Sequence, residues 1–156
     1  MNRDRKELYA TINYTFSDES LLTAALTRVA YAGEHGIDKK QTMDRFAVLG
    51  DAVLDAAVIE YLLASGEDDK GEITREKIEL VNMSVFRGFA EKIRLPEFVF
   101  WGAGELRQRI WESGRVSAEC FEALCGAAYL DGGMTAVKII LMTVGNLGNR
   151  ANQFIS

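Results

Sequence analysis

Proline, histidine and cysteine are scarce in this chain of 156 residues. There is one proline, Pro96, one histidine, His35, and two cysteines, Cys120 and Cys125. A single proline leaves room for long uninterrupted helices. A single histidine in a glycine-bearing, loop-like segment argues against histidine-based catalysis and histidine-rich metal sites. Because both cysteines fall in one expected helix and point in different directions, we expect reduced core thiols and no disulfide.

The sequence also lacks a long charge-free apolar run and a surplus of basic residues. No such run approaches the roughly 20 residues that a bilayer crossing needs, and the polar start, residues 1–7, differs from a secretory signal. We therefore expect a cytoplasmic protein without a membrane partner. The formal net charge of -5 argues against a dedicated nucleic-acid-binding module. It does not exclude an enzyme, because acidic metal ligands count toward that charge.

Composition and apolar spacing predict an all-α fold in one domain. Hydrophobic residues make up 48% and charged residues 26% of the chain, which is typical of a globular protein. Apolar residues recur mostly at spacings of three and four, and strand-like alternation is scarce. The expected helices are 3–12, a helix capped by Ser17 or Asp18 and running through Leu26, 42–64, 74–93 capped by Thr74, 116–130 and 135–146. We expect a loop at 33–41 and an irregular segment with one short helix at 97–114. We find no repeat or linker, so 1–156 is predicted to be a single domain.

The longest predicted helix carries carboxylates inside an apolar stretch. Residues 46–59 are apolar on all sides of a helix, which predicts burial, except for Asp51 and Asp55. At about 100° per residue, spacings of seven and four place Asp44, Asp51 and Asp55 on one stripe. A buried carboxylate is costly unless it is paired, protonated or coordinated. Asp44 and Asp51 are therefore candidate functional residues, whereas we expect Asp55 to be structural or to face solvent.

The predicted helix 116–130 repeats this pattern. Its only charged residues are Glu119 and Glu122, at positions i and i+3 on one face. Small residues that would let another helix approach closely are Ala118, Ala123, Gly126 and Ala127. If the two acidic faces meet, a divalent cation with oxygen ligands would offset their repulsion. Mg²⁺ fits best, because it binds through a few carboxylates, keeps waters and can activate water for hydrolysis.

An ion-pair interpretation of the same carboxylates remains open. Acidic residues on such helices often pair with a basic side chain, and the candidates are Arg45, Lys77 and Arg115. The spacing of the acids by itself favours these ion pairs over a metal site.

Four blocks of sequence, in the same order, resemble the ribonuclease III family. The blocks are FSDESLLTAALT at 16–27, DRFAVLGDAVLD at 44–55, GEITR at 71–75 with LVN at 80–82, and FEALCGAAYLDGG at 121–133. The second block is similar to the family signature, typically ERLEFLGDAVL, and the last to FEALIGAIYLDGG. The resemblance covers about residues 16–140 and implies a ribonuclease III-type helical domain.

The resemblance also implies roles for particular residues. Asp51 matches the signature aspartate and Glu122 the essential glutamate, both metal ligands and catalytic residues in the family. Glu119 stands where the family usually has aspartate, so a third metal-binding carboxylate is kept. Asp44 replaces the signature's first glutamate, near the dimer interface and the substrate. Asn82 matches an asparagine near the catalytic valley.

Ala47 is the main departure from the family pattern. The family normally has a glutamate there, four residues before the aspartate, as a metal ligand or its support. The short Mini-III branch also carries alanine at this place, in an A-x-I-G-D context. Two hypotheses follow: an active enzyme, or a catalytically inactive ribonuclease III-like domain that serves as a dimerisation or RNA-binding scaffold.

The active form implied by the resemblance is a homodimeric endoribonuclease that cleaves double-stranded or structured RNA with Mg²⁺, or Mn²⁺ as an alternative. Full bacterial enzymes carry a C-terminal double-stranded-RNA-binding domain, for which we see no room here. RNA affinity is then expected from the helical domain or a partner. The candidate phosphate contacts are Arg3, Arg5, Lys6, Arg87, Lys92, Arg94, Arg107, Arg109 and Arg115.

Overall fold

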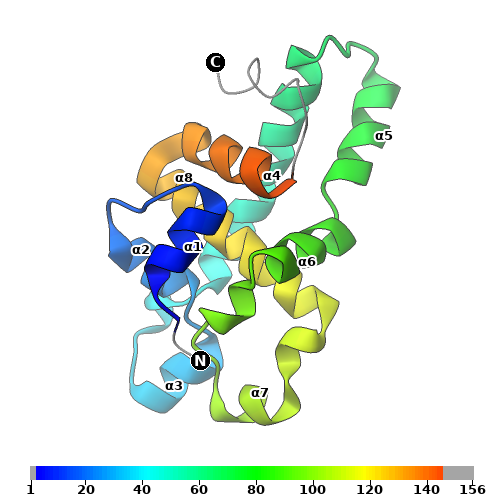
Figure 1. Cartoon of the computed structure of the whole chain (residues 1–156). Helices are drawn as coiled ribbons and strands as arrows, with labels where there is room; N and C mark the ends of the chain where they lie inside the picture. The colour runs from blue at the N-terminus through cyan, green and yellow to red at the C-terminus, as the bar shows by residue number, and fades with distance from the viewer. Residues whose placement is uncertain (1–2, 146–156) are drawn as a thin grey trace.

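A computed structural model of the protein describes residues 3–145 and consists of helices joined by short turns (Figure 1). The α-helices are α1 Arg5–Ile12, α2 Glu19–Ala25, α3 Val29–His35, α4 Asp44–Ala64, α5 Lys70–Leu80, α6 Met83–Lys92, α7 Ala103–Gln108 and α8 Gly114–Gly145. The 3-10 turns are η1 Lys39–Gln41, η2 Leu95–Glu97 and η3 Ile110–Glu112. Within residues 3–145, the only strand-like pairing is an isolated bridge between Thr27 and Phe100. The predicted all-α fold class is confirmed.

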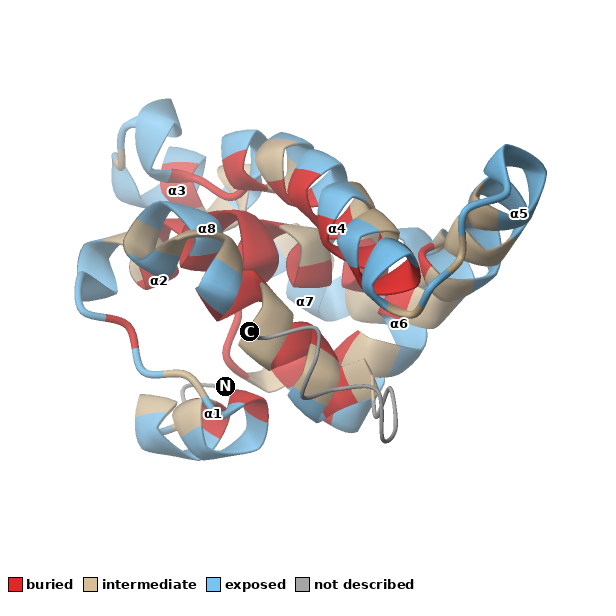
Figure 2. Ribbon diagram, turned by 90° about the horizontal axis from the view of Figure 1, so that it is seen from above, coloured by how far each residue is buried: buried red, intermediate tan, exposed pale blue. Residues whose placement is uncertain are grey.

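The core is built around α8, which runs through the middle of the molecule with α4 and α6 packed against it (Figure 1). Buried residues concentrate on α8 and on the helix faces turned toward it (Figure 2). Cys120 and Cys125 are fully buried in this core and are free thiols, as predicted.

Two glycines allow α4 and α8 to cross in close contact. A Cβ atom on Gly50 would overlap the carbonyl oxygen of Glu122, and one on Gly126 would overlap the carbonyl oxygen of Phe46. Any larger residue at either position would push the helices apart. The crossing therefore brings the turn of α4 that carries Asp51 next to the turn of α8 that carries Glu122.

The predicted break at residues 131–133 is present inside α8. Gly133 has a φ of 71° and a ψ of -165°, so the chain leaves helical geometry there and resumes it directly afterwards. Glycine reaches this positive φ without the strain that a Cβ atom would add. The second half of the helix is described to Gly145, and its expected last residue, Asn146, lies outside the described residues.

α8 is also the one helix in the described part of the chain that is long and apolar enough to cross a membrane. About half of its most apolar window is buried inside the protein. The core helix of a soluble protein passes the same test of length and composition, so this property is weak evidence for a membrane span.

The predicted single helix 74–93 is wrong, because two helices occupy this segment. α5 begins earlier than predicted, where the side chain of Asp69 accepts a hydrogen bond from the Glu72 backbone N–H at 2.8 Å. The backbone is extended at Val81 and Asn82. Asn82 Oδ1 accepts from the Val85 N–H at 3.0 Å and so starts α6. An asparagine that caps a new helix competes with continuation of the old one.

The predicted loop 33–41 is also partly wrong. α3 extends to His35 and ends at Gly36, which adopts a φ of 65°, and η1 covers Lys39–Gln41. α3 has only seven residues, which is too short for apolar periodicity to reveal it.

The first helix begins at Arg5 rather than residue 3, because Asp4 caps it. Residues 97–114 contain one short α-helix, α7, as predicted.

Candidate active site

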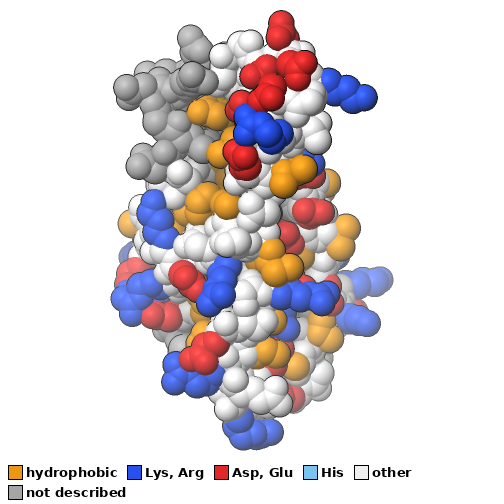
Figure 3. Space-filling view, turned by 90° about the vertical axis from the view of Figure 1, so that its right-hand side faces the viewer, with side chains coloured by type: hydrophobic (Ala, Val, Ile, Leu, Met, Phe, Trp, Pro, Cys, Tyr) orange, Lys and Arg blue, Asp and Glu red, His pale blue; other side chains and the backbone are white. Residues whose placement is uncertain are grey.

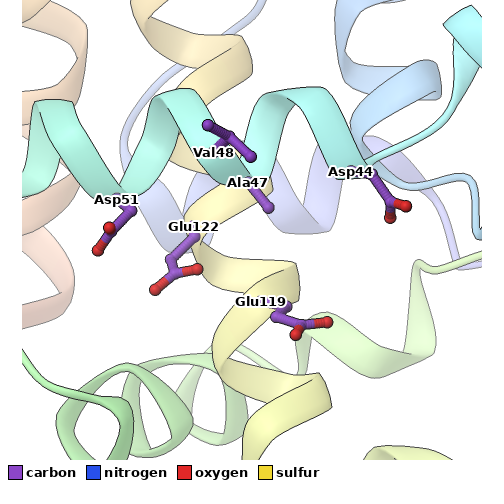
Figure 4. Close-up of a pocket in the computed structure, with 6 residues that line it drawn as sticks. All are labelled: Asp44, Ala47, Val48, Asp51, Glu119 and Glu122. Atoms are coloured by element: carbon purple, nitrogen blue, oxygen red, sulfur yellow. The ribbon is translucent and has the colours of Figure 1, made fainter.

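Four carboxylates from α4 and α8 surround one open hollow of about 490 Å³. The lining residues are Asp44, Ala47, Val48, Asp51, Glu119 and Glu122. In Figure 4 the side chains of Asp51 and Glu122 lie side by side at the helix crossing. Glu119 follows on the neighbouring turn of α8, and Asp44 lies further along α4 (Figure 4). The structure therefore brings together four of the five predicted site residues.

The expectation that α4 is buried on all sides is wrong. Asp44 and Asp51 are exposed, and Val48 beside them is 75% exposed. The opposite side of α4 contributes Phe46 and Leu54 to the core. The exposed face of α4 also carries alanine and valine, so the sequence is apolar on all sides although only one side of the helix packs against the core. The two glutamates of α8, Glu119 and Glu122, are half-buried.

Glu122 has a strongly perturbed carboxyl group. Burial is the largest cause that raises its pKa, and the charges of Asp51, Glu119 and Asp55 add to it, so that the pKa reaches about 7. Within residues 3–145, Asp44, Asp51 and Glu122 have no ion-pair partner and no side-chain hydrogen bond. A cation would offset this local excess of negative charge.

The ion-pair interpretation holds for the other two acids. Asp55 lies 3.5 Å from Lys77, and it does not line the hollow. Glu119 lies 3.2 Å from Arg115 and 3.9 Å from Arg28. Arg45, the remaining candidate from the sequence, stacks on the ring of Phe46. Asp55 and Glu119 are thus neutralised by basic side chains, whereas Asp44, Asp51 and Glu122 are not, and of these three Asp51 and Glu122 lie side by side.

Asn82 lies at a second, smaller hollow of about 190 Å³ on the α6 side of the same acids. The lining residues are Asp51, Val81, Asn82, Met83, Phe86, Arg115, Ala118, Glu119 and Glu122. The amide of Asn82 is already engaged, because Nδ2 donates to the Ile78 carbonyl at 2.9 Å and Oδ1 accepts from Val85. Its observed contacts are those of a helix cap.

The donor set suits a magnesium ion that keeps most of its waters. No group of three or more His, Cys, Asp or Glu side chains within residues 3–145 converges as a metal-binding cluster. Mg²⁺ commonly binds through one or two carboxylates plus waters and substrate phosphates. The adjacent, uncompensated carboxylates of Asp51 and Glu122 match that limited requirement.

Most arginines expected to contact phosphate are paired with a nearby glutamate. The pairs are Arg3–Glu7, Arg87–Glu91, Arg94–Glu97, Arg109–Glu112 and Arg115–Glu119. On the face shown in Figure 3, basic and acidic side chains are interspersed. That face therefore shows no separate basic patch.

The sequence did not single out Arg28, which links distant parts of the chain to the site. Its Nε and Nη2 atoms donate to Glu105 Oε1 at 3.0 and 2.8 Å, and its Nη1 atom faces Glu119. Glu105 and Glu119 are far from Arg28 in the sequence, so helical spacing carries no signal of these contacts.

Comparison with known proteins identifies the family. Residues 18–145 match the ribonuclease-III-like family. Ribonuclease 3 of Halalkalibacterium halodurans is 36% identical over 136 residues, which cover 86% of this chain and 52% of that protein. Ribonuclease 3 of Streptococcus sanguinis is 33% identical over 145 residues, covering 92% and 62%. The chain thus spans about half to three fifths of the length of these relatives.

Solved structures show the same fold. The nuclease domain of ribonuclease III from Campylobacter jejuni superimposes with a TM-score of 0.81 at 29% identity, covering 94% of this chain and 98% of that one. A second structure of that domain, with a TM-score of 0.80, concerns structural flexibility in a region involved in dimer formation. Together with the match over residues 18–145, these similarities show that the chain belongs to the ribonuclease-III-like family.

Proposed function

We propose that this chain is the nuclease unit of an endoribonuclease that hydrolyses phosphodiester bonds in double-stranded or structured RNA. The observation that carries the proposal is the adjacent pair Asp51 and Glu122, which no basic side chain within residues 3–145 neutralises. Membership of the ribonuclease-III-like family supports the same reaction.

In this proposal Asp51 and Glu122 hold Mg²⁺, or Mn²⁺ as an alternative. When bound there, the cation would activate a water and stabilise charge on the leaving oxygen. Glu119 lines the same hollow and would assist in holding the cation. Asp44, exposed at the far end of the hollow, lies where substrate would pass. Asn82 sets the start of α6 and so shapes the second hollow.

A cleavage assay on duplex RNA tests this function. Wild-type protein is expected to cut in the presence of Mg²⁺ or Mn²⁺ and to stop when the metal is removed with a chelator. Asp51→Asn and Glu122→Gln should each abolish cleavage while the protein stays folded by circular dichroism. Wild-type activity in either variant would remove both residues from the reaction.

We also propose a homodimer. Val48, 75% exposed beside the hollow, is an apolar side chain in a position that a second copy would cover. The arm formed by the end of α4 with α5 carries further exposed apolar residues, Leu63 and Ile78. α5 itself has no buried residue (Figure 2). Sedimentation that finds only monomer at micromolar concentration would count against this assembly.

A catalytically inactive scaffold is the second candidate function. Ala47 lines the hollow where the family normally supplies a carboxylate, so fewer ligands are available to hold a cation. A scaffold would bind duplex RNA or dimerise without cutting. Binding by the wild type, with no cleavage in either Mg²⁺ or Mn²⁺, would favour this function over the enzyme.

A cytoplasmic location is proposed because both cysteines are buried free thiols, which suits a reducing compartment. Cell fractionation tests this, and recovery in an extracellular or membrane fraction would contradict it.

A further inference from the structure

Both carboxylate oxygens of Glu119 face an arginine. Arg115 Nε donates to Oε1 at 3.2 Å, and Arg28 Nη1 lies 3.9 Å from Oε2. The two arginines differ in how far their side chains are exposed and in how firmly they are held. Arg28 is fixed inside the protein, whereas the Arg115 side chain is 77% exposed.

Arg28 is held by contacts on several sides. Its side chain is 15% exposed, and it donates two hydrogen bonds to Glu105. Its guanidinium lies 5.6 Å from the centre of the Trp101 ring. Glu105 in turn accepts a hydrogen bond from the Gly102 N–H at 3.0 Å. These contacts leave Arg28 a fixed positive charge beside Glu119.

Arg115 has one carboxylate partner and faces the second hollow. It lines that hollow together with Asp51 and Glu122, the proposed metal-binding pair. Of the side chains that line either hollow in residues 3–145, Arg115 is the one cation. An exposed ion pair such as Arg115–Glu119 contributes little to stability, so another anion can replace Glu119 at small cost.

We propose that Arg115 binds a phosphate of the RNA backbone in the second hollow, with Glu119 and Arg28 as its positioning residues. The proposal rests on the proposed function. Before RNA binds, Glu119 holds the Arg115 guanidinium at the edge of the hollow. When Arg115 turns to a phosphate, Arg28 continues to balance the charge of Glu119. A guanidinium suits this task because it can donate two parallel hydrogen bonds to one phosphate group.

The test compares Arg115→Ala, Arg115→Lys and the control Arg75→Ala. Arg75 is also an exposed arginine paired with glutamates, but it lies on α5 and lines neither hollow. Cleavage of a labelled RNA duplex gives KM and kcat at several salt concentrations, and fluorescence anisotropy gives Kd for the same duplex. Circular dichroism melts show that each variant is folded.

Loss of one phosphate contact predicts a roughly tenfold higher KM and Kd for Arg115→Ala. The slope of affinity against salt should fall by about one, because one fewer counterion is released. Arg115→Lys should recover part of the loss, and Arg75→Ala should stay close to wild type.

Wild-type KM, Kd and salt slope in Arg115→Ala would overturn the proposal, as would an equal loss in Arg75→Ala. A wild-type protein that neither binds nor cuts duplex RNA would instead overturn the proposed function itself. If the wild type binds without cutting, Kd and its salt slope still decide the role of Arg115.

Discussion

Replacing Glu122 with glutamine is expected to stabilise the metal-free protein at alkaline pH while leaving it nearly unchanged at acidic pH. Burial, and then the charges of Asp51 and Glu119, raise the pKa of this carboxyl from 4.5 to about 7. The folded state therefore holds the proton more strongly than the unfolded state. The stability that this provides is complete below about pH 4.5 and is lost as the pH rises through about 7.

The size of the effect follows from the same pKa. A rise from 4.5 to about 7 corresponds to about 3.4 kcal/mol at about 1.36 kcal/mol per pH unit. Because Glu122 is only half-buried, solvent screening reduces this to about 1–2 kcal/mol. For a chain of this length, that is a rise in Tm of about 2–8 °C.

Thermal melts at pH 5 and pH 8 in a chelating buffer measure the difference between wild type and Glu122→Gln. The matched control is Asp51→Asn, which removes one of the charges that raise the Glu122 pKa. In that background the gain from Glu122→Gln should shrink, and the double-mutant cycle gives the coupling. An identical Tm difference at both pH values, or a loss at pH 8, would refute the electrostatic account of this site.

Three further changes test the geometry. Ala47→Glu should tighten Mg²⁺ binding by roughly 10–100-fold, because a carboxylate there lines the same hollow. Unchanged affinity by calorimetry would contradict the facing-helix arrangement. Gly126→Ala should cost about 1–3 kcal/mol in urea unfolding, because its Cβ would overlap the Phe46 carbonyl. Gly88→Ala, where nothing lies within 4 Å of the new Cβ, serves as the control and should not destabilise the protein. Asn82→Ala should cost about 1 kcal/mol through loss of the α6 cap, and no loss in urea unfolding would show that this cap is unimportant.

Local sequence patterns were sufficient to locate the two helices that carry the site. Apolar spacing predicts α4 and the first half of α8, because each has a core face with uninterrupted helical periodicity. The pattern also predicts the break in α8, where two adjacent glycines, Gly132 and Gly133, follow Asp131. Small residues such as Gly126 indicated a close helix contact, which the structure shows against α4.

The boundary between α5 and α6, and the short helix α3, could not be predicted from the same patterns. Helical spacing continues across Val81 and Asn82, so the sequence suggested one helix where the structure has two. The boundary lies where Asn82 caps α6 and competes with continuation of α5. α3, with seven residues, has too few turns for its apolar face to be recognised.

The sequence by itself determined which residues could form a metal site, because helical spacing and the family motif both depend on positions along the chain. Tertiary structure decided which of those acids are neutralised. Asp55 is paired because α5 places Lys77 beside it, and Glu119 is paired through Arg115 and the distant Arg28. Exposure was decided in the same way, since α4 packs against α8 on one side only and leaves Asp51 open. Charge compensation and the exposure of a particular acid depend on neighbours brought together by folding, and helical periodicity does not identify those neighbours.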